Sequence, residues 1–470
     1  MNEGSQHRQN RELIDTLFQM NQQKLHQLGI RDASEKLTSE RSVHDLRRSS
    51  DRRDSDEVSV LTLKESDGVL RWENGSGFYP HKPGKKRRAH RQGNQLYIPG
   101  KIIRQFKFEN LPPNQVDLAL NQLDATLNDH LGFYELVQSN NRWERQKSPI
   151  ENPNPTGKIL LIIHGTFSNT DNNLTAFNDT PFGRGFLNQA KSNYDQIIAF
   201  SHPTVGVSPF TNAVELGSFF RTSKADVDVI CHSRGGLVSR WWNEIIESHS
   251  DRKVRIVFLG ATLGGTSLAS PYKLKAALDW LVNVSRGVTT GLQVGSAIFP
   301  VASGFFAAVM GINRIFTSIV GTAAKTPLLD AGIALVPGLN GQSRQGKNSE
   351  LIGLRNSFDR LSKTEQSKLL KSYYFIGSNF EPNHQEPWWK FWKNFSKQAI
   401  FDFGADKIFQ KSNDLVVETE SMNELCDQLD SSHQQTLKKQ TFNFAEGDKI
   451  HHLNYFSAQK TLKLIEKHLS

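Results

Sequence analysis

The chain has 470 residues, 37% of them apolar and 10% aromatic, which is enough for one large catalytic domain with additional segments. Its two cysteines exclude a disulfide framework, and Met1 to Asn21 contain no basic stretch followed by an apolar run, so we expect a cytoplasmic protein. A net charge of +9 permits an anionic partner without specifying which kind.

Residues 1–95 are rich in Arg, Ser, Asp and Gln and poor in apolar residues, so we predict a largely disordered basic arm. Residues 11–28 are an exception, because their leucines, Ile14 and Phe18 recur at helical spacing. We expect this helix to pack on the protein's own body rather than on a partner. The acid-free basic run at 82–91 is interpreted as a solvated linker, so we expect no nucleic-acid partner.

Residues 96–157 contain strand-like segments at 96–98, 102–108 and 133–137 and a helical pattern at 115–131, and we assign them to the domain that follows. From residue 158 onward, short apolar runs typical of buried parallel strands alternate with longer segments. These runs are 158–163, 196–200, 227–231, 254–260, 373–377 and 440–445. The alternation predicts an α/β fold, with a mostly parallel sheet flanked by helices, over 158–470.

The first chemical motif is a strand that ends in His164-Gly165-Thr166-Phe167, and the second is the segment 227–238. This second segment has the pattern strand, tight turn, helix, with Ser233 at the apex of the turn, as in a nucleophile elbow. Gly235 supplies the small residue two positions after the serine, whereas Cys231 stands where glycine is common. The alternative is that Ser233 is an ordinary helix N-cap.

A long insertion follows at about 266–350, and its segment 287–313 carries no charge. Such a segment could be a lid or buried helical hairpin, an interfacial membrane contact, or a membrane span. Its glycines, its proline and its position inside a catalytic domain argue against a span. We therefore expect a lid, and we keep contact with a membrane surface as an open alternative.

A serine nucleophile needs a histidine base that is oriented by a carboxylate. Asp414, which comes after the strand at 373–377, is our choice for this carboxylate, although Leu415 follows it where glycine is frequent. Asp402, Asp406 and Glu418 are the alternatives. His451 and His452 come after the last predicted strand. The motif His-x-x-Tyr-Phe that begins at His452 resembles the histidine loop of lipases, which favours His452, with His451 as the alternative. Two adjacent histidines rarely bind one metal ion, so we expect no metal site there.

On these motifs the sequence resembles the α/β-hydrolase superfamily in its lipase and esterase branch, and within it a bacterial group with the elbow Cys-His-Ser-Arg-Gly-Gly. The resemblance covers residues 158–470. It implies a triad of Ser233 as nucleophile, Asp414 as acid and His452 as general base. It also implies that the backbone N–H groups of Thr166 and Arg234 form the oxyanion hole.

The sequence therefore predicts a serine hydrolase that cleaves carboxylic esters or thioesters without a metal or organic cofactor. The apolar insertion favours lipid-like or acyl-chain substrates, and a peripheral position at a membrane is an alternative to a fully cytoplasmic one. Two other functions remain open: a peptidase or amidase with the same triad, and a catalytically silent adaptor in signalling or defence. The sequence does not specify the oligomeric state.

Overall fold

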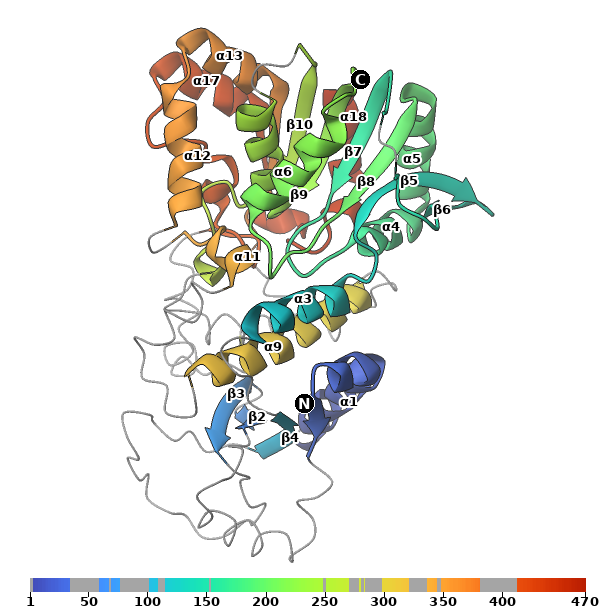
Figure 1. The fold of residues 1–470 in the computed structure, drawn as a ribbon, viewed down its shortest axis with the longest axis vertical. Helices are drawn as coiled ribbons and strands as arrows, with labels where there is room; N and C mark the ends of the chain where they lie inside the picture. The colour runs from blue at the N-terminus through green and yellow to red at the C-terminus, as the bar shows by residue number, and fades with distance from the viewer. Residues whose placement is uncertain are drawn as a thin grey trace, which may run out of the picture.

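The computed structural model describes residues 3–33, 59–66, 69–76, 101–108, 115–151, 154–247, 251–269, 279, 283, 298–320, 336–344, 348–380 and 412–470. A large α/β body lies at one end of the molecule and a smaller sheet at the other, with helices between them (Figure 1). The predicted strand at 96–98 lies outside the described residues.

An eight-stranded sheet forms the centre of the body, in the order β12-β11-β10-β9-β7-β8-β5-β6. Neighbouring strands from β12 to β8 run parallel, whereas β5 pairs antiparallel with both β8 and β6. The six strands predicted from residue 158 onward agree with the observed ones to within one residue at each end. The strands are β5 (Gly132–Ser139), β6 (Arg142–Arg145), β7 (Lys158–Ile163), β8 (Gln196–Ser201), β9 (Asp226–His232), β10 (Val254–Leu259), β11 (Tyr373–Ser378) and β12 (Thr441–Phe444).

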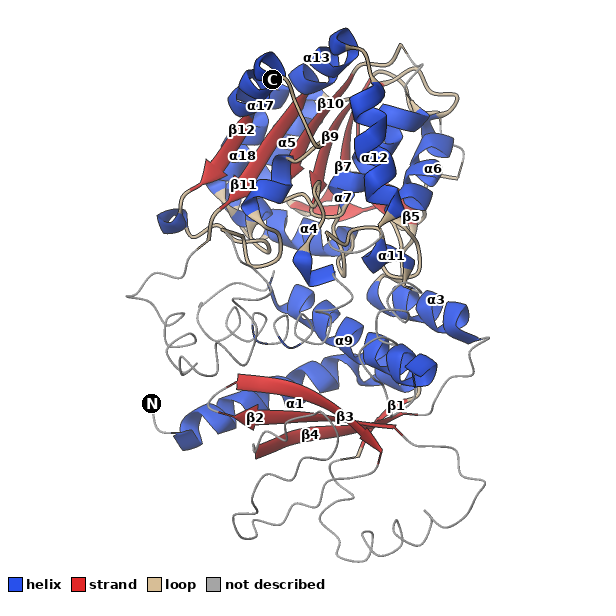
Figure 2. Ribbon diagram, turned by 90° about the vertical axis from the view of Figure 1, so that its left-hand side faces the viewer, coloured by secondary structure: helices blue, strands red, loops and turns tan. Residues whose placement is uncertain are grey.

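The strand β7 shows why its sequence is a continuous apolar run. Side chains alternate between the two faces of a strand, so Ile159, Leu161 and Ile163 pack into one core and Leu160 and Ile162 into the other. Both faces are apolar because helices cover both of them (Figure 2). This arrangement confirms the predicted α/β-hydrolase fold.

Two sets of helices make up these covering layers. One face of the sheet is covered by α4 (Thr170–Asn178), α5 (Pro181–Asn193) and α18 (Gln459–Leu469). The other is covered by α6 (Pro209–Phe220), α7 (Gly235–Arg240), the π-helix η3 (Trp241–Ile246), α12 (Ser349–Arg360), α13 (Lys363–Ser372) and α17 (Ser431–Gln440).

The N-terminal region differs from the predicted disordered arm wherever the structure describes it. Helix α1 (Glu3–Gln27) contains most of the predicted amphipathic segment, which is thereby confirmed as a helix. A four-stranded antiparallel sheet accompanies α1, and one of its strands, β4, had been assigned to the domain that follows. The strands, in the order β1-β4-β2-β3, are β1 (Ile30–Asp32), β2 (Ser59–Ser66), β3 (Val69–Ser76) and β4 (Lys101–Phe108).

The apolar insertion packs against the helix and strands that the structure describes in the N-terminal region. Its helix α9 (Ile298–Val320) lies between this small sheet and helix α3 (Val116–Leu127), which faces the body (Figures 1 and 2). Phe18 of α1, Phe106 of β4 and Phe306 of α9 belong to one buried cluster. The apolar residues of the arm that the structure describes are thus buried by a helix more than 200 residues further along the chain, which local composition cannot reveal.

Polar contacts tie the insertion to the small sheet as well. The backbone N–H groups of Leu70 and Trp72 in the edge strand β3 donate to Asn283 Oδ1 and Asp279 Oδ1 at 3.1 and 2.8 Å. These two side chains of the insertion thus supply acceptors for backbone donors at the edge of the sheet. Asn21 of α1 donates to the Ser303 hydroxyl at 2.7 Å. In the part of the chain that the structure describes, no helix has both the length and the apolarity that a membrane crossing needs.

Replacing Ile14 by alanine should lower the free energy of unfolding by about 2–4 kcal/mol, because its fully buried side chain packs in the cluster around α9. The exposed Met20 on the same helix provides the control, since Met20→Ala should change stability by less than about 0.5 kcal/mol. Urea denaturation measures both variants. Equal stability of the two would show that α1 does not contribute its core contacts in solution.

Candidate active site

The predicted elbow forms where β9 ends. Ser233 has φ +54°, a left-handed conformation that is costly for a residue with a side chain and is found at strained functional turns. Its backbone N–H donates to Leu259 O at 3.0 Å, and its carbonyl accepts from Gly236 N at 3.0 Å. A Cβ atom on Gly235 would lie only 2.9 Å from His164 O, so the strand and helix approach each other as an elbow requires.

Cys231 does not disturb this geometry. Its side chain is buried within the sheet, where the thiol donates to Val257 O at 3.5 Å. Burial raises the pKa of the thiol to about 12, so it stays protonated and is a poor nucleophile. The small thiol thus occupies the position where glycine is common without displacing the turn.

The structure brings Asp414 and His452 together. His452 Nδ1 lies 2.9 Å from Asp414 Oδ2, and the backbone N–H of His452 donates to Asp414 O at 2.9 Å. Asp414 is fully buried, and its Oδ1 accepts from the N–H groups of Val416 and Val417 at 3.1 and 2.9 Å. Leu415 has φ +85°, the conformation that makes glycine favourable at this position. The carboxylate is therefore held firmly and the proton of His452 is directed to Nδ1, leaving Nε2 as the acceptor.

Two further side chains support the histidine loop: Tyr455, which belongs to the His-x-x-Tyr-Phe motif, and His232, to which sequence analysis gave no role. The Tyr455 hydroxyl donates to Asp414 Oδ2 at 3.1 Å, and burial together with this carboxylate raises its pKa, so it stays protonated. In His232, the residue before Ser233, Nε2 lies 2.9 Å from the His452 carbonyl oxygen. Because a carbonyl oxygen can only accept, Nε2 must carry the proton and donate it to this bond. Burial lowers the pKa of His232, so the ring is neutral. This bond ties the elbow to the histidine loop.

The rival residues have other contacts. His451 Nδ1 accepts from the N–H of Leu453 at 3.2 Å, and burial lowers the pKa of His451 to about 4. Glu418 accepts from the N–H of Ser267 at 3.4 Å. Asp402 and Asp406 lie outside the described residues. The structure thus places His452, rather than its neighbour, on Asp414.

The loop that follows β7 passes directly over the elbow. A Cβ atom on Gly165 would lie 2.7 Å from the Cβ of Ser233, so the backbone there approaches as only glycine allows. Neither Thr166 nor Arg234 donates its backbone N–H to another described residue. The Thr166 hydroxyl donates instead to Gln342 Oε1 at 3.0 Å. The backbone N–H groups of Thr166 and Arg234 thus have no acceptor among the described residues.

The surroundings of these loops are apolar and closed. Phe167, Leu415 and Leu453, which each follow one of the predicted site residues, pack in or against the cluster that contains α9. A Cβ atom on Gly304 of α9 would lie 2.8 Å from Phe167 O, so this helix crosses the loop after β7. Ser233 is 3% exposed and His452 4%, so both side chains are buried.

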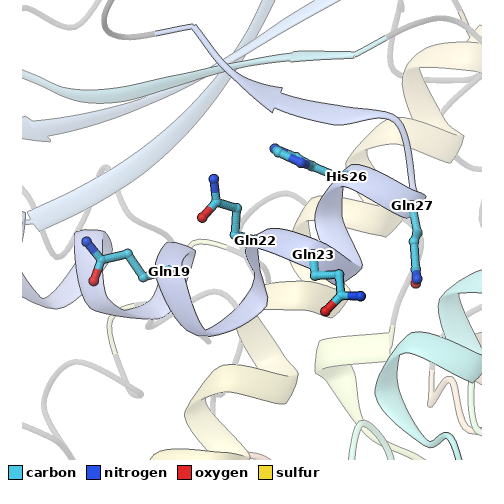
Figure 3. Close-up of a pocket in the computed structure, with 5 residues that line it drawn as sticks. All are labelled: Gln19, Gln22, Gln23, His26 and Gln27. Atoms are coloured by element: carbon cyan, nitrogen blue, oxygen red, sulfur yellow. The ribbon is translucent and has the colours of Figure 1, made fainter.

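A polar pocket lies elsewhere, on the exposed face of α1 (Figure 3). It is lined by Gln19, Gln22, Gln23, His26 and Gln27, which all belong to α1. Within the described ranges, no group of three or more His, Cys, Asp or Glu side chains is arranged to hold a metal ion.

Comparison with known proteins gives a family and a set of distant structural likenesses. Lipase BlEst2 of Bacillus licheniformis, in its mature form, is 15% identical over 69% of this chain and 96% of its own, with a TM-score of 0.35. Lipase 1 of Pelosinus fermentans is 12% identical over 66% of this chain and 98% of its own, with a TM-score of 0.34. No curated protein matches the sequence. The family model described as "Domain of unknown function (DUF7379)" matches residues 132–470, well over half of the chain, and the protein therefore belongs to this family.

Proposed function

We propose that the protein is a serine hydrolase of the lipase and esterase type that cleaves carboxylic esters or thioesters. The observation that carries this proposal is the buried pair of Asp414 and His452, 2.9 Å apart, together with the serine at φ +54° whose neighbour His232 contacts the His452 carbonyl at 2.9 Å. A carboxylate held by two backbone N–H groups is a fixed partner for an imidazole, as a general base requires. Ser233 is the nucleophile, His452 the base and Asp414 the residue that orients it.

In the first half of the reaction, His452 Nε2 takes the proton from the Ser233 hydroxyl while Oγ attacks the substrate carbonyl carbon. The backbone N–H groups of Thr166 and Arg234 donate to the resulting oxyanion. Collapse of this intermediate breaks the bond to the alcohol or thiol, which leaves with the proton from His452. In the second half, His452 deprotonates a water molecule that attacks the acyl-enzyme, and the acid departs as Ser233 regains its proton.

The apolar cluster beneath α9 supports an acyl-chain substrate. Phe167 and Leu415 border the reacting groups, and Phe306 belongs to the same cluster. An acyl chain would replace contacts in this cluster, and each buried methylene contributes roughly 0.8 kcal/mol, which corresponds to up to about fourfold in kcat/KM.

Turnover of p-nitrophenyl esters from acetate to palmitate, beside the matching p-nitroanilides, tests the proposal. We expect ester hydrolysis whose kcat/KM rises with chain length, and no measurable hydrolysis of the anilides. Anilide hydrolysis at a comparable rate would favour a peptidase or amidase. No turnover by the folded protein, with or without detergent, would favour a catalytically silent adaptor.

A further inference from the structure

A buried carboxylate outside the triad holds a turn close to the site. Asp124, in α3, is 3% exposed and lies before the part of the chain that matches the family. Its Oδ1 accepts from the backbone N–H groups of Thr204 and Val205 at 2.7 and 2.9 Å, and its Oδ2 accepts from that of Gly206 at 2.6 Å. Three successive N–H groups that converge on one carboxylate fix the backbone of this turn.

The segment that begins with this turn contacts both sides of the predicted oxyanion hole. The Thr204 hydroxyl accepts from the backbone N–H of Phe167, the residue after Thr166, at 3.3 Å. Further along, Asn212 Oδ1 accepts from the guanidinium of Arg234 at 2.7 Å, and Val207 O accepts from the same nitrogen. The segment 204–212 therefore supports the loop after β7 and the residue after Ser233 together.

Helix α11 (Pro337–Asn340) closes a ring of contacts back to Thr166. The Gly338 N–H donates to Val205 O at 2.9 Å, and the Gln342 amide donates to Gly338 O at 2.9 Å. The same amide group, through Oε1, accepts from the Thr166 hydroxyl at 3.0 Å. The turn held by Asp124 is thus connected to Thr166 by two independent routes.

The backbone that this ring holds is in a conformation that needs such support. Phe167 has φ +56°, which is unfavourable for an aromatic residue unless its surroundings fix it. The Thr166 N–H belongs to the Gly165–Thr166 peptide, which meets the Thr166–Phe167 peptide at the Cα of Thr166, so a backbone change at Phe167 reaches this N–H through a single Cα.

We propose that Asp124 is a positioning residue for the proposed hydrolysis, and that through the segment 204–212 it sets the places of the two N–H groups that receive the oxyanion. This inference rests on the proposed function. Asp124 contacts no reacting atom, and its action passes through Thr204 to the loop after β7 and through Asn212 to Arg234. Its negative charge also faces the buried Arg234, whose guanidinium has its pKa lowered by burial to about 10 and stays charged at neutral pH.

The test compares Asp124→Asn with Asp117→Asn, an exposed residue on the same helix whose replacement removes the same charge. The asparagine amide cannot accept from all three N–H groups. We expect kcat per titrated active site to fall by about 10–100-fold in Asp124→Asn with KM changed by less than about threefold, since an oxyanion donor acts in the transition state. Asp117→Asn should match the wild type.

Two further readouts separate positioning from general damage to the fold. The affinity for a trifluoromethyl ketone of a long-chain acid, which forms a tetrahedral adduct, should fall in parallel with kcat/KM. The pH dependence of kcat/KM should keep its midpoint, because Asp124 does not contact His452. Thr204→Val removes only the acceptor of the Phe167 N–H and should lower kcat by about 5–20-fold, again with little change in KM. If Asp124→Asn fails to fold, this variant tests the positioning role in its place.

The outcomes are distinguishable from a failure of the proposed function. If the wild type hydrolyses esters, and Asp124→Asn and Thr204→Val both keep its kcat per active site, the positioning role is wrong and the hydrolase proposal stands. If the only change is a smaller titrated fraction of active protein, Asp124 serves stability alone and the inference is overturned. If the wild type hydrolyses no ester and reacts with no serine probe, both proposals fail together.

Discussion

Replacing Ser233 by alanine should lower kcat for ester hydrolysis by ~10⁴-fold or more, because the acyl-enzyme can no longer form. The bonds that hold this turn come from the backbone of Ser233, so the variant should keep the fold of the wild type. Steady-state hydrolysis of p-nitrophenyl butyrate measures the loss, and circular dichroism and the Tm check the fold.

Ser239 provides the matched control for this substitution. It is a buried serine in α7, six residues from Ser233, and its hydroxyl donates to Gly235 O at 2.8 Å, as a serine within a helix commonly does. Ser239→Ala should keep the activity of the wild type to within about threefold. Residual activity of Ser233→Ala above about 1% of the wild type would contradict its role as nucleophile.

Replacing His452 by alanine should also lower kcat by ~10⁴-fold or more, because the hydroxyl of Ser233 then has no base to take its proton. His451→Ala provides an unusually close control, since both histidines are buried and adjacent in the chain. We expect His451→Ala to lose less than about tenfold, because His451 contacts Leu453 and Phe380 rather than the carboxylate of Asp414. The same esterase assay compares the two variants.

The reverse pattern, with a large loss of kcat in His451→Ala and a small one in His452→Ala, would show that His451 rather than His452 is the base. Equal losses in both variants, accompanied by a lower Tm, would point to a structural effect of the loop. Tm measurements on both proteins therefore accompany the kinetics.

Much of the body and of the site follows from local sequence. A buried parallel strand is a short apolar run with turn residues at its ends, and that signal located β7 through β12. Ser233 was predicted as the nucleophile because an elbow needs a strand, a turn and a helix in close succession. Asp414 and His452 were predicted from their positions after later strands, and the structure brings these two side chains into contact.

Residues that act through distant contacts left no local signal. Asp124 is an acidic residue in a helix, and its three N–H partners lie about 80 residues further along the chain. Gln342 lies in the insertion, 176 residues from Thr166. Tyr455 is different, because it belongs to the His-x-x-Tyr spacing that identified His452, and a buried tyrosine one turn after a base is a natural partner for the carboxylate.

The described part of the N-terminal arm differs from the prediction for the same reason. The mean composition of residues 1–95 is that of a disordered arm, but Ile14, Phe18 and Trp72 are placed where α9 can bury them. Composition counts apolar residues without knowing which partner will cover them. The apolar character of the insertion suggested a lid. The packing of α9 against α1 and α3 also explains this apolar character.

Reaction with a fluorophosphonate, followed by peptide mass spectrometry, tests the central claim most directly, because this probe phosphonylates only an activated serine. We expect the wild type to carry one label, on Ser233, and the variants Ser233→Ala and His452→Ala to carry none. A folded wild type that remains unlabelled even when detergent loosens the helices around the site, or a label on another serine, would contradict the proposed triad.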